Sequence, residues 1–509
     1  MTLQTPTPAR RAGSLALLAL AASLSACSLV PTYERPAAPV ASQWPSQDGM
    51  AAAPGESAAE LPWQDFVQDA GLRELITLAL ANNRDLRVAI ANIEQARAQY
   101  QIRSADQVPS LNGALTGSRS APNPYEFLTG KSVASSYGLS VGVTSWELDF
   151  FGRVAALKDA ALAQYLATDE ARKTTQISLI ANIASTWLQL KTDTELQLLA
   201  ERTLATREQS LQLTKLRFDN GASSALDMRQ AESLAASARA TRAQQQRLRA
   251  QDINLLTLLV GQPLPERLVP ALPQVTAAAA PRSLSEPTPA VQPAAELPGF
   301  APVPAGLPSD LLLRRPDVRA AEQQLIAANA NIGAARANFF PRITLTGSFG
   351  RSSGDLDGLF GSGGSRAWSF APAVSLPIFD MGRNQASLDA AKAARDAAVA
   401  QYEKAVQTAF REVADALAGR ATLGEQLAAL QAQAEAERDR FRLADLRYRN
   451  GIATYLDLLD SQRSLFSVEQ ALAQTRLAQR SNEVQLYKAL GSGWIDAQPE
   501  ATAASAPAR

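Results

Sequence analysis

Residues 216–232 read LRFDNGASSALDMRQAE, and residues 446–462 repeat the pattern as LRYRNGIATYLDLLDSQ. The offset is 230 residues (446 minus 216), and long segments rich in Ala, Leu, Gln and Arg flank both copies. An Asn-Gly pair between two helical segments marks a helix end followed by a turn. Ser224 and Thr454 each precede an Asp by three residues, which is the capping-box start of another helix. The sequence therefore predicts the same helical hairpin twice, with its tip at each Asn-Gly.

The composition argues against catalysis. The 509 residues include no histidine, which removes His-based triads, His metal sites and the commonest general base. Lys plus Arg and Asp plus Glu both number 49, so no net charge favours binding to nucleic acid. We therefore expect no enzymatic activity, no cofactor, no resident metal and no nucleic-acid partner.

The N-terminus has the pattern of a secretory signal. Arg10 and Arg11 precede an apolar run too short to span a bilayer, and the run ends in Leu-Ser-Ala before Cys27, the single cysteine. This ending resembles the bacterial lipobox. The resemblance implies a signal peptide over 1–26, with N-palmitoyl and S-diacylglycerol groups on Cys27, and Ser28 after it implies sorting to the outer membrane. An ordinary signal peptide with an incidental cysteine is the alternative.

The rest of the chain divides by its hydrophobic periodicity and its proline content. The predicted parts are a tether (27–70), a first repeat (71–262), a Pro-rich linker (263–309), a second repeat (310–494) and a disordered tail (495–509). The linker holds twelve of the chain's 29 prolines. Each repeat is expected to contain a helix, two strands, a long helix, the tip and another helix.

The expected helices and strands follow the same order in the two repeats. The first repeat should hold a helix over about 72–106, strands at 110–117 and 136–144, a helix from Arg153 to Asn220 and a helix over 223–259. The second should hold a helix over 310–338, strands at 342–350 and 368–378, and helices over 384–448 and 454–489. Residues 351–367, rich in Gly and Ser, are expected to form a surface loop. Pro372 and Pro377 count against a regular central strand at 368–378.

The lengths of these elements restrict the architecture. Two short helices laid end to end match one helix of roughly 65 residues, about 100 Å at 1.5 Å per residue. Four strands with one apolar face cannot close a barrel alone, and open edges are not tolerated in lipid. An eight-stranded barrel is filled by its own side chains, whereas three copies would give about twelve strands and a possible channel. The sequence therefore predicts a mainly α, internally duplicated chain that trimerises into a membrane β-barrel continued by an α-barrel.

Several motifs resemble those of the TolC-type outer-membrane factors, in the lipoprotein branch that serves tripartite multidrug efflux systems. They are LPSDLLLRRPDV at 307–318, LPIFDMGR at 376–383, YKALGSGW at 487–494 and the two Asn-Gly tips. The resemblance implies a homotrimer with a 12-stranded outer-membrane barrel and a 12-helix periplasmic tunnel. It implies a periplasmic adaptor and an inner-membrane pump as partners, and a passive exit duct for drugs as the function.

The resemblance also assigns candidate residues at the tips. Asp457 and Asp460 match aspartate rings that narrow the periplasmic aperture, and Tyr448 and Asp227 match closing contacts in the family. The family arginine after the second tip is replaced by Ala453. The candidate residues for adaptor docking are Arg217, Asn220, Gly221, Arg447, Asn450 and Gly451.

Other interpretations stay open for these residues and for the protein. Asp227 and Asp457 are also placed to cap a helix, whereas Asp460 lies too far along to do so. Six carboxylates, Asp457 and Asp460 from three copies, would attract cations at a narrow lumen. A structural lipoprotein that does not conduct, or a secretion duct for a different class of pump, are the alternative functions.

Overall fold

The computed structural model describes residues 28–41, 44, 61–121, 133–272, 297–303, 309–361, 363–450 and 452–494. The predicted signal peptide, Cys27, Gly451, the tail 495–509 and most of the Pro-rich linker lie outside these residues. The chain divides into two compact units, one formed by residues 1–38, 91–170 and 319–404 and the other by residues 39–90, 171–318 and 405–509. The units do not coincide with the two repeats, because each unit takes segments from both.

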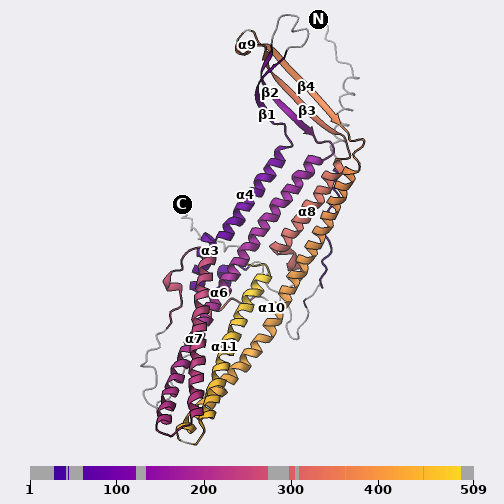
Figure 1. Cartoon of the computed structure of the whole chain (residues 1–509). Helices are drawn as coiled ribbons and strands as arrows, with labels where there is room; N and C mark the ends of the chain where they lie inside the picture. The colour runs from indigo at the N-terminus through magenta and orange to yellow at the C-terminus, as the bar shows by residue number, and fades with distance from the viewer. Residues whose placement is uncertain are drawn as a thin grey trace, which may run out of the picture. The chain divides into compact units, whose positions relative to one another are not determined.

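Helices make up most of the described chain (Figure 1). They are α2 Trp63–Phe66, α3 Ala70–Asn82, α4 Arg84–Ala105, α6 Arg153–Asp219, α7 Ala225–Val260, α8 Pro316–Ala337, α9 Leu356–Phe360, α10 Arg383–Arg449 and α11 Tyr455–Ala489, with 3-10 turns η2 Glu266–Leu268 and η4 Ser309–Arg314. The long helices α6 and α10 have 67 residues each, which confirms the two long helices expected from the sequence. No helix in the described part of the chain has a stretch long and apolar enough to cross a bilayer.

Two expected helices differ from those observed. The helix expected over 72–106 is interrupted at Asn83, whose backbone leaves the helical region with ψ at 135°. The Asn83 side chain accepts a hydrogen bond from the Leu86 N–H at 2.9 Å and donates one to the Leu259 carbonyl at 2.8 Å. A side chain that bonds the backbone in this way competes with the helix and starts a new one. The helix expected over 310–338 begins only at Pro316, a residue suited to the first helical position.

The four strands form one antiparallel sheet in the order β1-β2-β3-β4, within the first compact unit (Figure 1). They are β1 Leu111–Ser120, β2 Ala134–Leu148, β3 Arg342–Ser353 and β4 Ser365–Ser375. All four predicted strands are confirmed, but the loop expected over 351–367 is shorter and contains α9, because β3 and β4 extend into it. Pro372 lies inside β4 opposite Leu345; within one chain β4 is an edge strand, where proline is tolerated.

The two faces of the sheet differ in chemistry. Cross-strand pairing places Val141 opposite Phe349 and Phe349 opposite Trp368, so these three side chains share one face. Most of this face is exposed, with Trp368 at 75% and Phe349 at 64% of their full accessible surface. The other face carries mainly Ser, Thr, Gly and Ala. An exposed apolar sheet with two unpaired edges requires a covering environment.

The second unit has a conventional core near the end of the chain. Phe66 stacks on Tyr487 with ring centroids 3.9 Å apart, and the Tyr487 hydroxyl donates to the Leu61 carbonyl at 2.7 Å. Arg315, a buried residue that directly follows η4, donates to the Ala489 carbonyl at 2.6 Å and pairs with Asp317 at 2.7 Å. The RRPD and YKALG motifs therefore serve packing in this unit.

Candidate functional site: the two hairpin tips

The first tip joins α6 to α7. Gly221 has a φ of +72°, the left-handed conformation that glycine adopts without strain. The Ala222 N–H bonds the Arg217 carbonyl at 2.7 Å and the Gly221 N–H bonds the Phe218 carbonyl at 2.9 Å, which together close the end of α6. The Asn220 side chain donates to the Leu216 carbonyl at 2.7 Å. The helix end and turn predicted from Asn-Gly are confirmed here.

The second tip joins α10 to α11 with the same backbone pattern. The Asn450 side chain donates to the Leu446 carbonyl at 2.7 Å, and the Ile452 N–H bonds the Arg447 carbonyl at 2.9 Å. Gly451 lies outside the described residues. The Arg447 side chain is exposed and forms no hydrogen bond or ion pair with the described residues, so it is available to a partner molecule.

Asp227 and Asp457 both cap the helices that leave the tips. Each belongs to a complete capping box, in which the Ser224 or Thr454 hydroxyl accepts the aspartate N–H and the carboxylate accepts the cap residue's N–H. The Ser224 hydrogen bonds lower the pKa of Asp227. The capping interpretation of both residues is confirmed.

The structure brings the two tips together through Arg217 and Tyr448, both in the second compact unit. The Arg217 Nη1 donates to the Tyr448 hydroxyl at 2.6 Å, and its guanidinium lies 5.2 Å from the centre of the Tyr448 ring. Tyr455 lies against the same ring, with centroids 5.5 Å apart. Burial raises the pKa of Tyr448 although Arg217 opposes this, so its hydroxyl stays protonated and accepts the hydrogen bond as a neutral group.

Asp460 forms an ion pair in this structure. Its carboxylate pairs with Arg440 on α10, and Arg440 also reaches Glu437 at 3.2 Å. Asp460 and Arg440 are 60% and 47% exposed, so the pair is solvated. Sequence reasoning placed Asp460 at an aperture and missed Arg440, because an ion pair across a hairpin leaves no local motif.

Sequence reasoning also missed the partner of Arg217. It grouped Arg217 with the docking residues and Tyr448 with the gate, whereas the two form one contact. The sequence held a partial indication of this contact. Ala453 stands where the resemblance led us to expect an arginine, and the first tip provides a different arginine, Arg217. Within the described residues no group of three or more acidic, His or Cys side chains could hold a metal ion.

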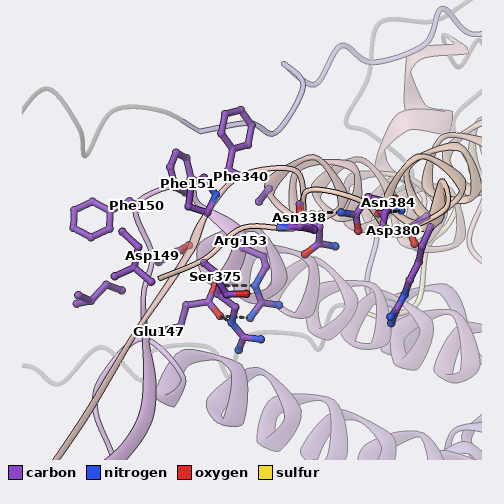
Figure 2. A pocket seen from close by; sticks show the side chains of 18 residues that line it. Glu147, Asp149, Phe150, Phe151, Arg153, Asn338, Phe340, Ser375, Asp380 and Asn384 are labelled. Atoms are coloured by element: carbon purple, nitrogen blue, oxygen red, sulfur yellow. Dashed lines mark hydrogen bonds and ion pairs between the residues drawn. The ribbon is translucent and has the colours of Figure 1, made fainter. Parts of the chain in front are cut away.

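An open cavity lies in the first unit, where the sheet meets the starts of α6 and α10 (Figure 2). Its volume is about 390 Å³. Glu147 is held there by Arg153 and Arg342, each with a 2.6 Å contact to Oε2. Asp149 and Asp380 accept backbone N–H groups at the first turns of α6 and α10. Each labelled carboxylate thus has a structural role, fixing how β2 leads into α6 and how β4 leads into α10.

The chain is similar to known proteins of one family. A family described as "Outer membrane efflux protein" matches residues 75–262 and 307–492. The chain is 46% identical over 487 residues to the "Probable efflux pump outer membrane protein TtgC" of Pseudomonas putida, covering 95% of this chain and 96% of that one. It is 45% identical over 479 residues to the "Outer membrane protein OprJ" of Pseudomonas aeruginosa, covering 94% and 95% of the two chains.

Solved structures show the same fold. The open-state MtrE outer membrane channel of Neisseria gonorrhoeae aligns with a TM-score of 0.78 at 39% identity, over 93% of this chain and all of that one. CusC aligns with a TM-score of 0.76 at 37% identity, over 92% of this chain and 100% of that one. The chain therefore belongs to the outer membrane efflux protein family. It is an outer-membrane channel protein of efflux systems, and the resemblance found in the sequence is confirmed.

Proposed function

We propose that this protein is a trimeric exit duct in which three sheets close a 12-stranded outer-membrane barrel and the helices form a 12-helix periplasmic tunnel. The observation that carries the proposal is the four-stranded sheet with an exposed apolar face and unpaired edges on β1 and β4. Pairing β4 of one copy with β1 of the next would remove every edge, which a sheet in lipid requires. The trimer is the smallest assembly expected to leave an open lumen.

The duct would act with a periplasmic adaptor and an inner-membrane pump, and lipid on Cys27 would add an anchor in the outer membrane. The relatives named for efflux pumps, among them one named for toluene efflux, support a small toxic compound as cargo. The pump would supply the energy, and this chain would supply the path. Arg447 and the two Asn-Gly turns are the proposed adaptor-docking residues.

The tips are the proposed gate. Arg217 and Tyr448 join the two hairpins of one chain, and this contact would hold the tip region in one arrangement. Asp457 and Asp460 from three copies would attract cations at the aperture. The ion pair with Arg440 would partly offset the charge of Asp460, whereas the Asp457 carboxylate is held in its capping box.

Native mass spectrometry of the purified full chain tests the assembly. We expect a trimer that survives mild activation, because twelve strands joined edge to edge have no free edge from which to dissociate. A monomer extracted from membranes at high salt would instead support the alternative, a structural lipoprotein that does not conduct.

A further inference from the structure

The strands of the sheet carry an unbalanced set of charges. Their only carboxylate is Glu147 on β2, and their arginines are Arg119 on β1, Arg342 and Arg351 on β3, and Arg366 on β4. Glu147 is already neutralised by Arg342 and by Arg153 of α6. Three strand arginines therefore have no carboxylate partner in the sheet.

These three arginines lie on the apolar face, at the end of the sheet away from α6 and α10. In the register of the sheet, Arg351 lies directly opposite Leu139 of β2 on one side and opposite Arg366 of β4 on the other. The next row toward the helices holds Phe349 and Trp368, so two aromatic rings border the arginine pair. Arg119 lies two rows further toward the loops, opposite Ser135. The apolar face thus ends in an aromatic row followed by positive charge.

Two arginines directly opposite each other repel, and the chain does little to compensate. Arg351 donates to the carbonyls of Gly361 and Gly364 at 2.6 and 3.2 Å, which ties it to the loop without neutralising it. Arg366 is exposed and forms no hydrogen bond or ion pair with the described residues. The nearby α9 segment carries Asp355 and Asp357, but neither pairs with a strand arginine among the described residues.

A second copy of the chain would not supply the missing negative charge through the edge of the sheet. In the proposed barrel, β4 pairs with β1 of the next copy, and β1 contains no acidic residue. It would bring only another arginine, Arg119, to the same rim. The compensating anion must then come from outside the strands.

We propose that Arg351 and Arg366, assisted by Arg119, form a binding site for the phosphate groups of membrane lipids at the loop end of the barrel. This inference rests on the proposed function, because it needs the apolar face to lie in lipid. Guanidinium groups bind phosphate through paired hydrogen bonds, and aromatic side chains concentrate at the membrane interface. Rows on one face are about 7 Å apart along a strand, so one lipid can place its phosphate on the arginines and its chains on Phe349 and Trp368.

The test uses the full chain purified in detergent, with a diphosphorylated lipid A as the probe and native mass spectrometry as the readout. Arg366→Gln should weaken lipid binding about tenfold, since a hydrogen bond to a charged group is lost. Arg366→Lys should retain part of the affinity, and Arg87→Gln on α4, which changes an exposed arginine outside the sheet, should have no effect. Because Arg366 has no described internal partner, its removal should leave the thermal stability of lipid-free protein unchanged.

Three results would overturn the site. They are wild-type lipid affinity in Arg366→Gln, equal weakening in Arg87→Gln, or displacement of the lipid by excess inorganic phosphate, which would indicate a general anion site. The same spectra report the oligomer and its bound lipid separately. Trimers that bind no specific lipid would refute this inference alone, whereas the absence of trimers would refute the proposed function.

Discussion

Asp193 and Asp252 form a carboxyl pair inside the second unit, between α6 and α7. Asp193 is 3% exposed, and Oδ2 of Asp252 is buried without a hydrogen-bond partner in the described chain. Burial and the neighbouring Asp193 charge raise the pKa of Asp252 to about 7, and burial also raises the pKa of Asp193. The nearby Arg249 is occupied by Thr194 at 3.3 Å and by the Pro270 carbonyl at 2.7 Å. The pair therefore shares a proton near neutral pH.

The first prediction concerns the pH dependence of stability. Asp252 has a raised pKa in the folded chain, so its protonated form stabilises the fold below pH 4, and this stabilisation is lost as the pH rises toward about 7. The loss can reach about 1.4 kcal/mol per pH unit for one proton. Asp252→Asn, which keeps the shape without the charge, should flatten thermal stability between pH 4 and 7 and raise it above pH 7. Asp389→Asn, at an exposed site on α10, is the control. An unchanged pH profile in Asp252→Asn would contradict the shared proton.

At the scale of elements, the duplication extends to contacts that its sequence does not reveal. Glu208 pairs with Arg239 at 2.8 Å, and Arg438 pairs with Glu469 at 3.0 Å. The second pair is the first displaced by 230 residues with the charges exchanged. The geometry of the hairpin was retained while its residues changed, so a search for identical residues would not find this pair.

The contact between the tips gives the second prediction. Arg217→Gln and Tyr448→Phe should each raise channel conductance, because each removes a hydrogen bond worth about 1–3 kcal/mol that holds two hairpins together. The double variant should add little to the larger single effect, since both changes remove the same bond. Planar-bilayer recordings of the four proteins measure this.

Two matched controls come from the duplication itself. Arg447 occupies the position of Arg217 in the second tip but has no described partner, so Arg447→Gln should leave conductance unchanged. Phe218 occupies the position of Tyr448 in the first tip, so Tyr448→Phe introduces a ring that this fold already accepts. Fully additive effects of Arg217→Gln and Tyr448→Phe in the double variant, or an equal effect of Arg447→Gln, would argue against the Arg217–Tyr448 contact as a restraint on the tips.

The elements that could be predicted from the sequence are those defined by local chemistry. The Asn-Gly turns, the capping boxes and the strand alternation all depend on residues within a few positions, and the structure has them close to where they were expected. The interruption at Asn83 was missed because its partner, the Leu259 carbonyl, lies 176 residues away. The Arg217–Tyr448 and Arg440–Asp460 contacts were missed for the same reason.

At the scale of the whole molecule, the single chain is incomplete as a membrane protein. Its sheet presents Trp368, Phe370 and Val374 to the exterior at 64–75% exposure and leaves two edges unpaired. The periodicity and the strand lengths anticipated this incompleteness. The number of copies follows from a physical argument about lumen size, because no residue of one chain encodes a copy number directly.

The most direct test of the proposed duct is single-channel recording of the purified protein in planar bilayers, with Asp457→Ala/Asp460→Ala beside the wild type. We expect small, cation-preferring currents that lose this preference in the double variant. Asp396→Ala, an exposed change on α10, should keep it. A trimer that conducts nothing would contradict the exit duct, and unchanged selectivity in the double variant would contradict the aperture assigned to the tips.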